Sequence, residues 1–277
     1  MRTGKRGRHL PQGLLAGLSW GSLGTMRSWM PSCPLEANCS ATLHIARTDS
    51  VVWAWGAVTD NRTHKHQALQ VNVASPGCLA RLLAGEEEVR GPCTLVDGGV
   101  PHSLELQQGL VALVDSSSAL ARSIRTVSLR GAPATTVDTK PWDGSLEHGK
   151  SILRFLGPAR ASAGSKNRVQ DVLDWLDELE GQEKWFDVSL QQALAISNLS
   201  RSRFLHVFST TVGSPWRTYL IWRRALVAIS LVARGSLLTA AAHTAGYSDL
   251  AHLSRQFTAL FGIAPSKLAR DSHFVQA

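Results

Sequence analysis

Three histidines in the first half of the chain, His64, His66 and His102, are of a residue type that binds metals. A neutral imidazole nitrogen is a good ligand for Zn²⁺ or Fe²⁺, so the three side chains could share one ion. The same histidines could instead cap strands or line a pocket for an organic molecule. We expect this second arrangement, with no cofactor, and keep the metal site as the alternative.

Residue patterns that support covalent or phosphoryl-transfer chemistry do not occur in the sequence. There is no Gly-rich phosphate loop and no GxSxG nucleophile motif. The four cysteines, Cys33, Cys39, Cys78 and Cys93, form no CxxC pair, and reduced thiols are their expected state. A bridge between Cys33 and Cys39 would require an oxidising compartment. We therefore expect a protein that is not an enzyme.

Residues 190–267 point to a different chemistry, because a short helix, a turn and a second helix follow one another twice in this stretch. In the first unit, Ser189 and Gln192 have the spacing of a capping box. Ser200 can then cap the second helix of that unit. The spacing alone predicts a helix-turn-helix unit.

The second unit follows a long basic amphipathic helix that is predicted over residues 216–233. Gly246 can adopt the positive φ of a tight turn between helices, and Ser248 or Asp249 can cap the helix that follows. The chain is therefore expected to carry two helix-turn-helix units joined by one helix.

Helical periodicity indicates which side chains of each second helix face outward. Phe204 and Phe208 form the buried stripe in the first unit, and Leu253 and Phe257 form it in the second. The opposite face of such a helix can meet base edges in the major groove. The candidate DNA contacts, including those on the joining helix, are Arg201, Ser202, Leu205, His206, Arg217, Arg223, Leu250, Ala251, Ser254 and Arg255.

The chemistry of these candidates differs. Arg255 and His206 can donate hydrogen bonds to guanine or to phosphate, whereas Leu205 can offer only an apolar contact, for example to a thymine methyl group. An alternative for Arg255 is a structural salt bridge with Asp249. The arginines of the joining helix are candidate phosphate clamps.

The charge of the chain supports this assignment through its distribution. The net charge is +8; residues 187–277 carry nine basic and three acidic side chains, while residues 31–165 carry twelve of each sign. A second basic stretch lies in residues 1–30, which carry five basic side chains and no acidic one. A basic region that presents helices is the electrostatic pattern expected of a DNA-binding domain.

The first half of the chain has the texture of a small β-barrel or jelly roll. Short β-like runs alternate there with turn residues. The predicted strands are 43–46, 50–58, 68–74, 78–83, 94–96, 102–106 and 110–114. Helices are predicted over residues 116–129, 146–156 and 168–179, a loop between the first two, and a linker over 159–166.

We divide the chain into an extension (1–35), a sensing or dimerisation domain (36–165) and a DNA-binding domain (166–277). The extension begins like a signal peptide, but Pro11 and Gly13 interrupt its apolar run. We expect it to be disordered or non-native. Because the sequence has no apolar run of about 18 residues, we expect no membrane-spanning segment.

The side chains of the last 80 to 90 residues resemble the DNA-binding domain of AraC/XylS-type transcription regulators. The resemblance rests on residues 200–208 (SRSRFLHVF) and 242–249 (AHTAGYSD), and on single positions that carry the residue type found in the family. Those positions are Gly213, Tyr219, Arg224, Ala228, Arg255, Phe257, Phe261, Gly262 and Pro265. The resemblance implies a bacterial, cytoplasmic DNA-binding regulator.

The first half resembles, more weakly, the cupin-like sensor domain of many such regulators, through residues 64–70 (HKHQALQ) and 99–104 (GVPHSL). Metal-binding cupins place a glutamate where this chain has Gln70. The resemblance implies double-stranded DNA and a small-molecule effector as partners. It also implies a homodimer formed by the helices after the barrel, and RNA polymerase as a partner if the protein is an activator.

The sequence thus predicts an α+β protein of two domains, a cupin-like β-domain followed by an all-α domain with two helix-turn-helix units. Its expected function is effector-controlled, sequence-specific DNA binding. A metal-dependent cupin enzyme fused to a DNA-binding module is the main alternative. A first domain that only oligomerises is another.

Overall fold

The computed structural model describes residues 43–48, 50–58, 62–158, 168–182, 185 and 188–274. All of them belong to one compact unit. The predicted extension, the predicted linker at 159–166, Cys33 and Cys39 lie outside the described residues. The division into domains at residue 165 therefore stays a prediction.

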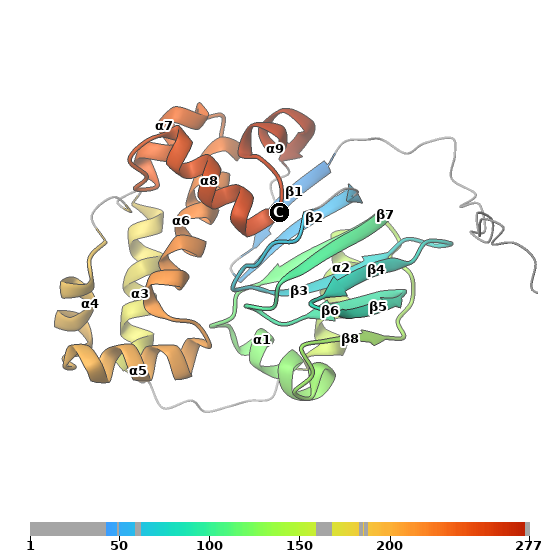
Figure 1. Cartoon of the computed structure of the whole chain (residues 1–277), viewed down its shortest axis with the longest axis horizontal. Helices are drawn as coiled ribbons and strands as arrows, with labels where there is room; N and C mark the ends of the chain where they lie inside the picture. Colours follow the sequence, from blue (N-terminus) through green and yellow to red (C-terminus); the bar gives the residue numbers. More distant parts are fainter. Residues whose placement is uncertain are drawn as a thin grey trace, which may run out of the picture. The chain divides into compact units, whose positions relative to one another are not determined.

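One sheet organises the first half of the chain, and its strand order is β8-β6-β3-β7-β2-β1-β9 (Figure 1). The strand pairs are antiparallel except β1 with β9, which is parallel. Strands β4 and β5 form a hairpin, and β4 pairs with β7 to connect this hairpin to the sheet. The strands are β1 (Leu43–Thr48), β2 (Val51–Val58), β3 (Leu69–Ala74), β4 (Ala80–Ala84), β5 (Glu87–Gly91), β6 (Cys93–Val96), β7 (His102–Val114), β8 (Ala134–Val137) and β9 (Ser272–Phe274).

Strand β7 is continuous where the sequence predicted two strands. Its first half pairs with β4, and its second half pairs with β2 and β3. Gly109, which lies between the two predicted strands, is placed where a Cβ atom would come 2.3 Å from the carbonyl oxygen of Val73. The glycine therefore permits close approach of two strands and does not end one.

Three strands, β5, β8 and β9, were not predicted, and the first two have polar sequences. Strand β5 is rich in glutamate and lies with its partner β4 on an exposed hairpin, where charged residues are tolerated. Strand β8 falls in the predicted loop, is only four residues long, and pairs with β6 at the edge of the sheet. Short edge strands leave little apolar pattern to detect.

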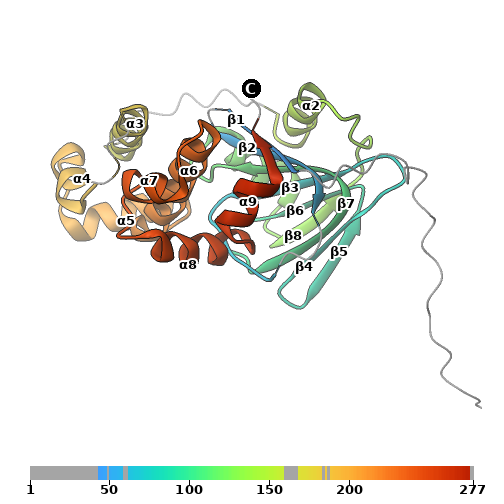
Figure 2. The same cartoon turned by 90° about the horizontal axis from the view of Figure 1, so that it is seen from above.

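Helices after β7 cover one face of the sheet (Figure 2). Helix α1 (Ala119–Ile124) begins at the N-cap Ser118 and continues as the π-helical turn η1 (Arg125–Leu129), within the helix predicted from 116 to 129. Helix α2 (Leu146–Leu156) has the predicted bounds. Its Ile152 and Leu153 are buried in one cluster with Trp53 and Leu110 of the sheet.

The second half of the chain is helical, as predicted. Helix α3 (Arg168–Gly181) precedes two helix-turn-helix units and packs on the first of them. The units are α4 (Leu190–Ser197) with α5 (Arg201–Val212), and α7 (Leu238–Thr244) with α8 (Leu250–Phe261). Helix α6 (Trp216–Ala233) joins them, and α9 (Pro265–Asp271) leads to β9. The antiparallel β-domain followed by a helix-turn-helix region confirms the predicted fold class.

Helix α6 is the centre of the helical half because most of its surface is buried. Tyr219 and Trp222 are each about 1% exposed. Phe204 and Phe208 of α5 pack edge-on against Trp216 at the start of α6, with their ring centroids 5.0–5.3 Å from that of Trp216. The same apolar cluster continues into the sheet, so both halves of the chain share a core.

Arg223 of α6 is buried, which contradicts the prediction that it clamps a DNA phosphate. Its guanidinium donates to Asp177 Oδ1 at 2.6 Å and to Glu180 Oε2 at 2.8 Å, both on α3. It also lies over the ring of Trp185, 5.3 Å from the centroid. A helical pattern could not reveal this role, because the acidic partners come from a separate helix.

Arg47 of β1 extends the same network to the sheet. It forms an ion pair with Glu180 and donates to Ser230 Oγ of α6 at 3.1 Å. A strand, α3 and α6 therefore meet at one partly buried group of charges. This group holds the helical half against the sheet.

Replacing Arg223 with alanine should lower the free energy of unfolding by about 1.5–3 kcal/mol, because the partly buried Glu180 loses one of its two cationic partners and the largely exposed Asp177 loses a charged hydrogen bond. Urea denaturation of the full chain measures this difference. Arg217→Ala, which removes an exposed arginine from the same helix, should change the stability by no more than about 0.5 kcal/mol. Equal effects of the two variants would contradict the structural role of Arg223.

Glu180 should make stability depend on acid pH. Burial by itself raises the pKa of this carboxyl, but Arg47 and Arg223 hold it below its ordinary value of 4.5. A depressed folded-state pKa gives stability that is complete above pH 4.5 and is lost as the pH falls through the folded-state value.

We therefore expect Glu180→Gln to be less stable than the wild type at neutral pH, with a difference that shrinks below pH 4.5. Urea midpoints measured across this range test the expectation. Glu178→Gln, at an exposed position on the same helix, serves as the control. A Glu180→Gln deficit that stays constant with pH would contradict the assignment.

Candidate DNA interface and ligand pocket

The first helix-turn-helix unit is built by the local signals that the sequence predicted. Ser189 and Gln192 form the capping box at the start of α4. The turn after α4 places Asn198 in the left-handed region with φ 50°, which asparagine tolerates. Ser200 is the N-cap of α5, although its side chain makes no capping hydrogen bond.

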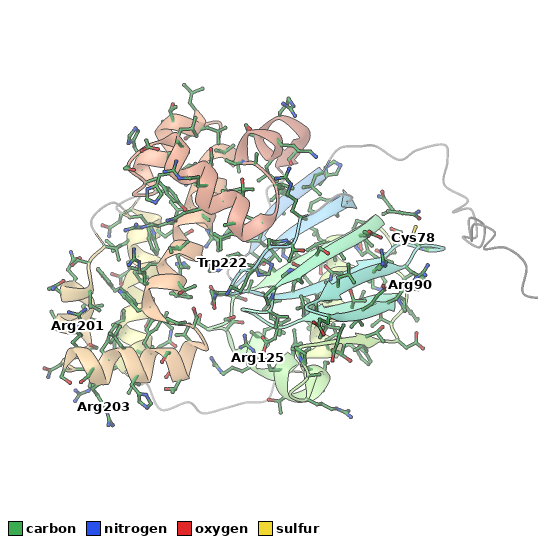
Figure 3. The ribbon with its side chains drawn as sticks, viewed as in Figure 1. Cys78, Arg90, Arg125, Arg201, Arg203 and Trp222 are labelled. Carbon is green, nitrogen blue, oxygen red and sulfur yellow. The ribbon has the colours of Figure 1, made fainter. Side chains whose placement is uncertain are left out.

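The outer face of α5 presents Arg201, Ser202 and His206, all exposed as predicted. Leu205 is only partly exposed, because it packs against the core beside its exposed neighbours. Arg203 is a further exposed cation that the sequence analysis did not select, and Figure 3 shows it projecting from α5 together with Arg201. The basic charge in the first turn of a recognition helix was the signal that could have identified it.

The second unit also follows its predicted turn chemistry. Gly246 has φ 81°, and Asp249 caps α8 by accepting a hydrogen bond from the backbone N–H of His252 at 2.6 Å. Helix α7 has Leu237 as its N-cap. In both units a residue with positive φ lies in the turn between the two helices. It is Asn198 in the first unit and Gly246 in the second.

On α8, Ala251 and Arg255 are exposed, and Leu250 and Ser254 are partly exposed. Within the described residues, no ion pair joins Arg255 to Asp249. The Asp249 carboxylate is used instead for the helix cap and for a hydrogen bond from Ser248 Oγ at 3.0 Å. The Arg255 guanidinium is therefore available on the outer face.

The joining helix contributes less to this face than predicted. Arg217 is exposed in its first turn, whereas Arg223 is buried as described above. The exposed arginines among the predicted DNA contacts therefore lie on three helices, Arg201 on α5, Arg217 on α6 and Arg255 on α8, and Arg203 of α5 adds one that was not predicted.

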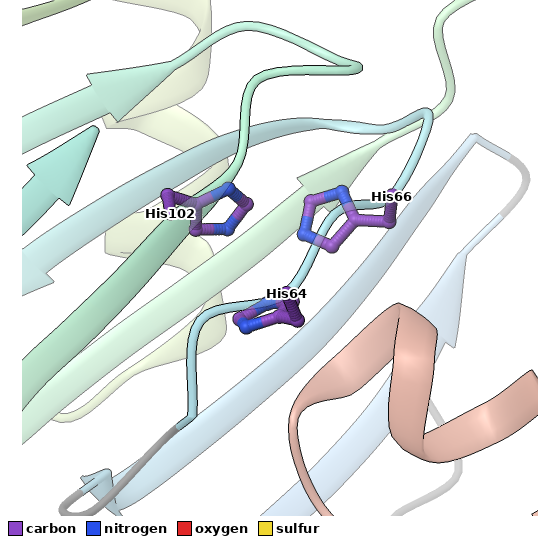
Figure 4. A group of neighbouring side chains, drawn as sticks. All are labelled: His64, His66 and His102. Carbon is purple, nitrogen blue, oxygen red and sulfur yellow. The ribbon is translucent and has the colours of Figure 1, made fainter. Parts of the chain in front are cut away.

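The predicted cluster of His64, His66 and His102 forms at the start of β7 (Figure 4). A backbone bridge aligns the segments, because His64 and His102 exchange N–H···O hydrogen bonds of 2.9 Å in both directions. The carbonyl of His66 accepts from Gly99 N at 2.7 Å, and Gly99 has φ 85° in the turn before β7. These contacts bring residues 38 positions apart together.

The three rings are close to one another, with centroids 4.4–5.5 Å apart. One ligand nitrogen from each ring lies within 4.8 Å of the others, and all three side chains are buried. Each Nδ1 faces a backbone carbonyl: His64 that of Arg62 at 2.9 Å, His66 that of Ala68 at 3.1 Å, and His102 that of Val100 at 2.8 Å.

Gln70, where metal-binding cupins carry a glutamate, faces the same centre. Its Oε1 lies 2.9 Å from His66 Nε2 and 3.2 Å from His102 Nε2. Its amide nitrogen donates to Asn72 Oδ1 at 2.8 Å, and Asn72 Nδ2 lies 3.1 Å from Thr94 Oγ1. A buried polar chain thus leads from β6 through β3 to the histidines.

Burial keeps the histidines neutral. It lowers the pKa of His66 to about 3 and that of His102 to about 4, and neighbouring histidines add to both effects. The pKa of His64 is lowered by the same cause. Neutral imidazoles can accept hydrogen bonds or bind a metal.

His64, His66 and Gln70 form the polar end of a cavity of about 100 Å³. The rest of its lining is apolar and comes from the sheet on one side and from α6, α8 and α9 on the other. The lining residues are Leu43, Ile45, Val52, Ala54, His64, His66, Gln70, Leu104, Val111, Leu113, Ile229, Phe257, Phe261, Ile263 and Leu268.

The pocket directly contacts the second helix-turn-helix unit. The ring of His66 lies 5.6 Å from that of Trp222 in α6 and 6.5 Å from that of Phe261 in α8. The backbone N–H of Lys65 points to the carbonyl of Ala259 in α8 at 3.4 Å. Helix α8 therefore exposes Ala251 and Arg255 on its outer side, while Phe257 and Phe261 in its C-terminal half are part of the pocket wall.

Comparison with known proteins identifies the helical half. A family described as "Helix-turn-helix domain" matches residues 194–271. No curated protein matches the sequence. No helix in the described part of the chain is long and apolar enough to cross a membrane.

Solved structures show what the fold is similar to. An apo form of a ToxT point variant from Vibrio cholerae strain SCE256 has a TM-score of 0.50 and 10% identity, over 82% of this chain and 99% of that chain. Another ToxT structure from Vibrio cholerae has a TM-score of 0.48 and 11% identity, over 80% and 98%. The AraC-like activator CuxR has a TM-score of 0.25 and 12% identity, over 65% and 77%.

The ToxT structure with a TM-score of 0.50 covers both the sheet and the helical half, so the two-part fold is shared as well as the matched domain. Residues 194–271 therefore form a helix-turn-helix domain of the AraC type, which confirms the predicted resemblance to AraC/XylS-type DNA-binding regulators.

Proposed function

We propose that the protein is a sequence-specific transcription regulator whose DNA binding responds to a small molecule held in the pocket between the sheet and α8. The observation that carries the proposal is the shared use of α8. Its outer face presents Arg255, and its inner end, through Phe257 and Phe261, lines the pocket.

The joining helix supports reading of two adjacent half-sites. Two recognition helices on one face of a duplex need a separation of about one helical turn, roughly 34 Å. At about 1.5 Å per residue, the 18 residues of α6 span about 27 Å. Its buried surface and the Arg223 network keep it straight and fixed, so α5 and α8 keep a constant spacing.

The pocket favours a ligand with an apolar body and one polar end. The lining is aliphatic and aromatic except at Gln70, His64 and His66, which can orient a polar group. A cavity of about 150 Å³ accommodates benzene, so a pocket of about 100 Å³ is too small for most effectors. A larger ligand must separate α8 from the sheet.

This mismatch in size links occupancy of the pocket to DNA binding. Two conformations are then compared, one with α8 packed on the sheet and one with α8 moved away from it. A ligand that fits only the second conformation binds it more tightly, and so shifts the population toward it. The movement changes the position of Arg255 relative to α5. The effector thus acts through the second unit, while α5 has no part in the pocket lining.

In cells we expect a homodimer in the cytoplasm, and contact with RNA polymerase if the protein activates transcription. These expectations follow from the AraC/XylS resemblance. The proposal assigns no catalytic step to the chain.

Arg255→Ala should weaken binding to a DNA site selected by the wild type from a random-sequence pool. The expected loss is about 1–3 kcal/mol, concentrated at one base position, if the guanidinium reads a base. Competition binding at a stated salt concentration, with single base substitutions in the site, measures it. Arg154→Ala, an exposed arginine on α2, is the matched control.

A loss in Arg255→Ala that is the same for every DNA sequence would assign the side chain to a phosphate. No loss relative to Arg154→Ala would contradict the placement of α8 against DNA.

Filling the pocket should abolish the response to ligand without abolishing DNA binding. Val111→Phe adds a ring inside the cavity at a cost of about 1–3 kcal/mol in stability. The probes are straight-chain alcohols and carboxylic acids of increasing length, including unsaturated fatty acids because one is bound in a ToxT structure. Thermal shift detects binding to each variant.

We expect at least one probe to stabilise the wild type and to change its affinity for DNA, and to do neither with Val111→Phe. Leu79→Phe, at an exposed apolar position, should behave as the wild type. A probe that acts equally on Val111→Phe would place the effector site elsewhere.

A further inference from the structure

The last strand of the structure extends the sheet beside the pocket. Strand β9 pairs in parallel with β1, and the register partners are Leu43 with Ser272, His44 with His273 and Ile45 with Phe274. On its other side β1 pairs with β2. Without β9, β1 would therefore be the edge of the sheet, with unpaired backbone groups along it. The end of the helical half thus supplies a strand to the sheet.

The two elements that β9 connects are both walls of the pocket. Leu43 and Ile45 of β1 line it on the sheet side. Ile263 and Leu268, just before and within α9, line it on the helical side. Helix α9 ends at Asp271 and β9 begins at the next residue, so no loop separates them. Helix α9 therefore cannot leave the sheet while β9 stays paired.

The same pairing restrains α8. Helix α8 ends at Phe261 and α9 begins at Pro265, so only a short connection joins them. The two helices also pack against each other. The pairing of β9 with β1 therefore holds α8 close to the sheet.

The pairing of β9 can open as well as close. It involves three residues at the edge of the sheet, and parallel pairing is slightly less stable per residue than antiparallel pairing. Ser272 Oγ is buried and has no hydrogen-bond partner in the described part of the chain, which disfavours the paired state. Elements with few buried contacts open more readily than the core.

We propose that α9 and β9 form a strap that closes the pocket, and that separation of β9 from β1 admits a ligand larger than the cavity of about 100 Å³. The inference rests on the proposed function, because it names the movement that links the pocket to α8. When the strap opens, α8 loses its connection to the sheet, and Arg255 on its outer face changes position. A large ligand then binds with an apparent affinity that is reduced by the fraction of closed protein.

Two truncations test the strap. A chain that ends at Asp271 lacks β9, whereas a chain that ends at Phe274 keeps it and is the matched control. The probe is N-phenyl-1-naphthylamine, an uncharged aromatic amine that is larger than benzene and fluoresces in apolar surroundings. The chain that ends at Asp271 should bind it about tenfold more tightly than the control, because more of the protein is open. Equal dissociation constants would overturn the proposal.

A reversible disulfide locks the strap and keeps the proposal testable if the shorter chain fails to fold. His44→Cys with His273→Cys replaces two register partners, and neither residue lines the pocket. Neighbouring strands lie about 4.8 Å apart, within the range of roughly 4.4–6.8 Å between the Cα atoms of a disulfide. Oxidation of the double variant should slow probe binding by about tenfold or more, and reduction should restore it.

His44→Cys alone reports any bridge to the native cysteines and should bind the probe at the same rate when oxidised and when reduced. Equal rates for the oxidised and reduced double variant would overturn the strap.

DNA affinity without ligand separates failure of the strap from failure of the effector pocket. For the site selected by the wild type, the chain that ends at Asp271 should differ from the chain that ends at Phe274 by about fivefold or more. If no form binds the probe or the alcohols and acids, the proposed effector function fails, and a difference in DNA affinity still supports the strap as a restraint on α8. Equal DNA affinities in that case would overturn the strap as well.

Discussion

The buried guanidinium of Arg223 is the interaction on which the arrangement of the helical half depends. An unpaired charge in that position would be strongly destabilising, so the acidic residues of α3 must stay beside α6. Arg47 continues the network to β1 through Glu180. Helix α6 is thereby fixed against both α3 and the sheet, and the two helix-turn-helix units that it joins are fixed with it.

The two helix-turn-helix units that α6 joins contact different parts of the protein. The first unit packs on α3 and on the start of α6, and offers Arg201 and Arg203 on α5. The second unit shares its core with the pocket through Phe257 and Phe261. A change inside the sheet domain can therefore reach α8 through direct packing, whereas it reaches α5 through α6 and through α3, on which the first unit packs. The asymmetry follows from contacts and not from sequence differences between the units.

Local signals predicted the helical half well, because caps and apolar periodicity act within a few residues. Ser189 with Gln192, Gly246 and Asp249 each occupy the predicted position, and α6 has the predicted bounds. Arg223 was assigned wrongly because its environment is set by α3 and β1, far away in sequence. The continuity of β7 through Gly109 was missed for the same reason, since only the neighbouring strand explains that glycine.

The histidine cluster was predicted as a set of residues, but its chemistry was not. The resemblance to cupins implied that His64, His66 and His102 could meet, and the structure brings them together with Gln70. The orientation of each ring depends on backbone carbonyls and on the chain from Thr94 through Asn72, which no spacing rule describes. The same holds for the pocket, whose walls come from strands and helices more than 100 residues apart.

The spacing of the DNA half-sites tests most directly whether α6 holds the two units rigidly. The measurement is the affinity for a selected site and for versions with about 5 or about 10 base pairs inserted between its half-sites. A rigid α6 predicts that both insertions abolish two-site binding, including the one that restores the helical phase. Binding of the version with about 10 inserted base pairs as tightly as the original would contradict the account.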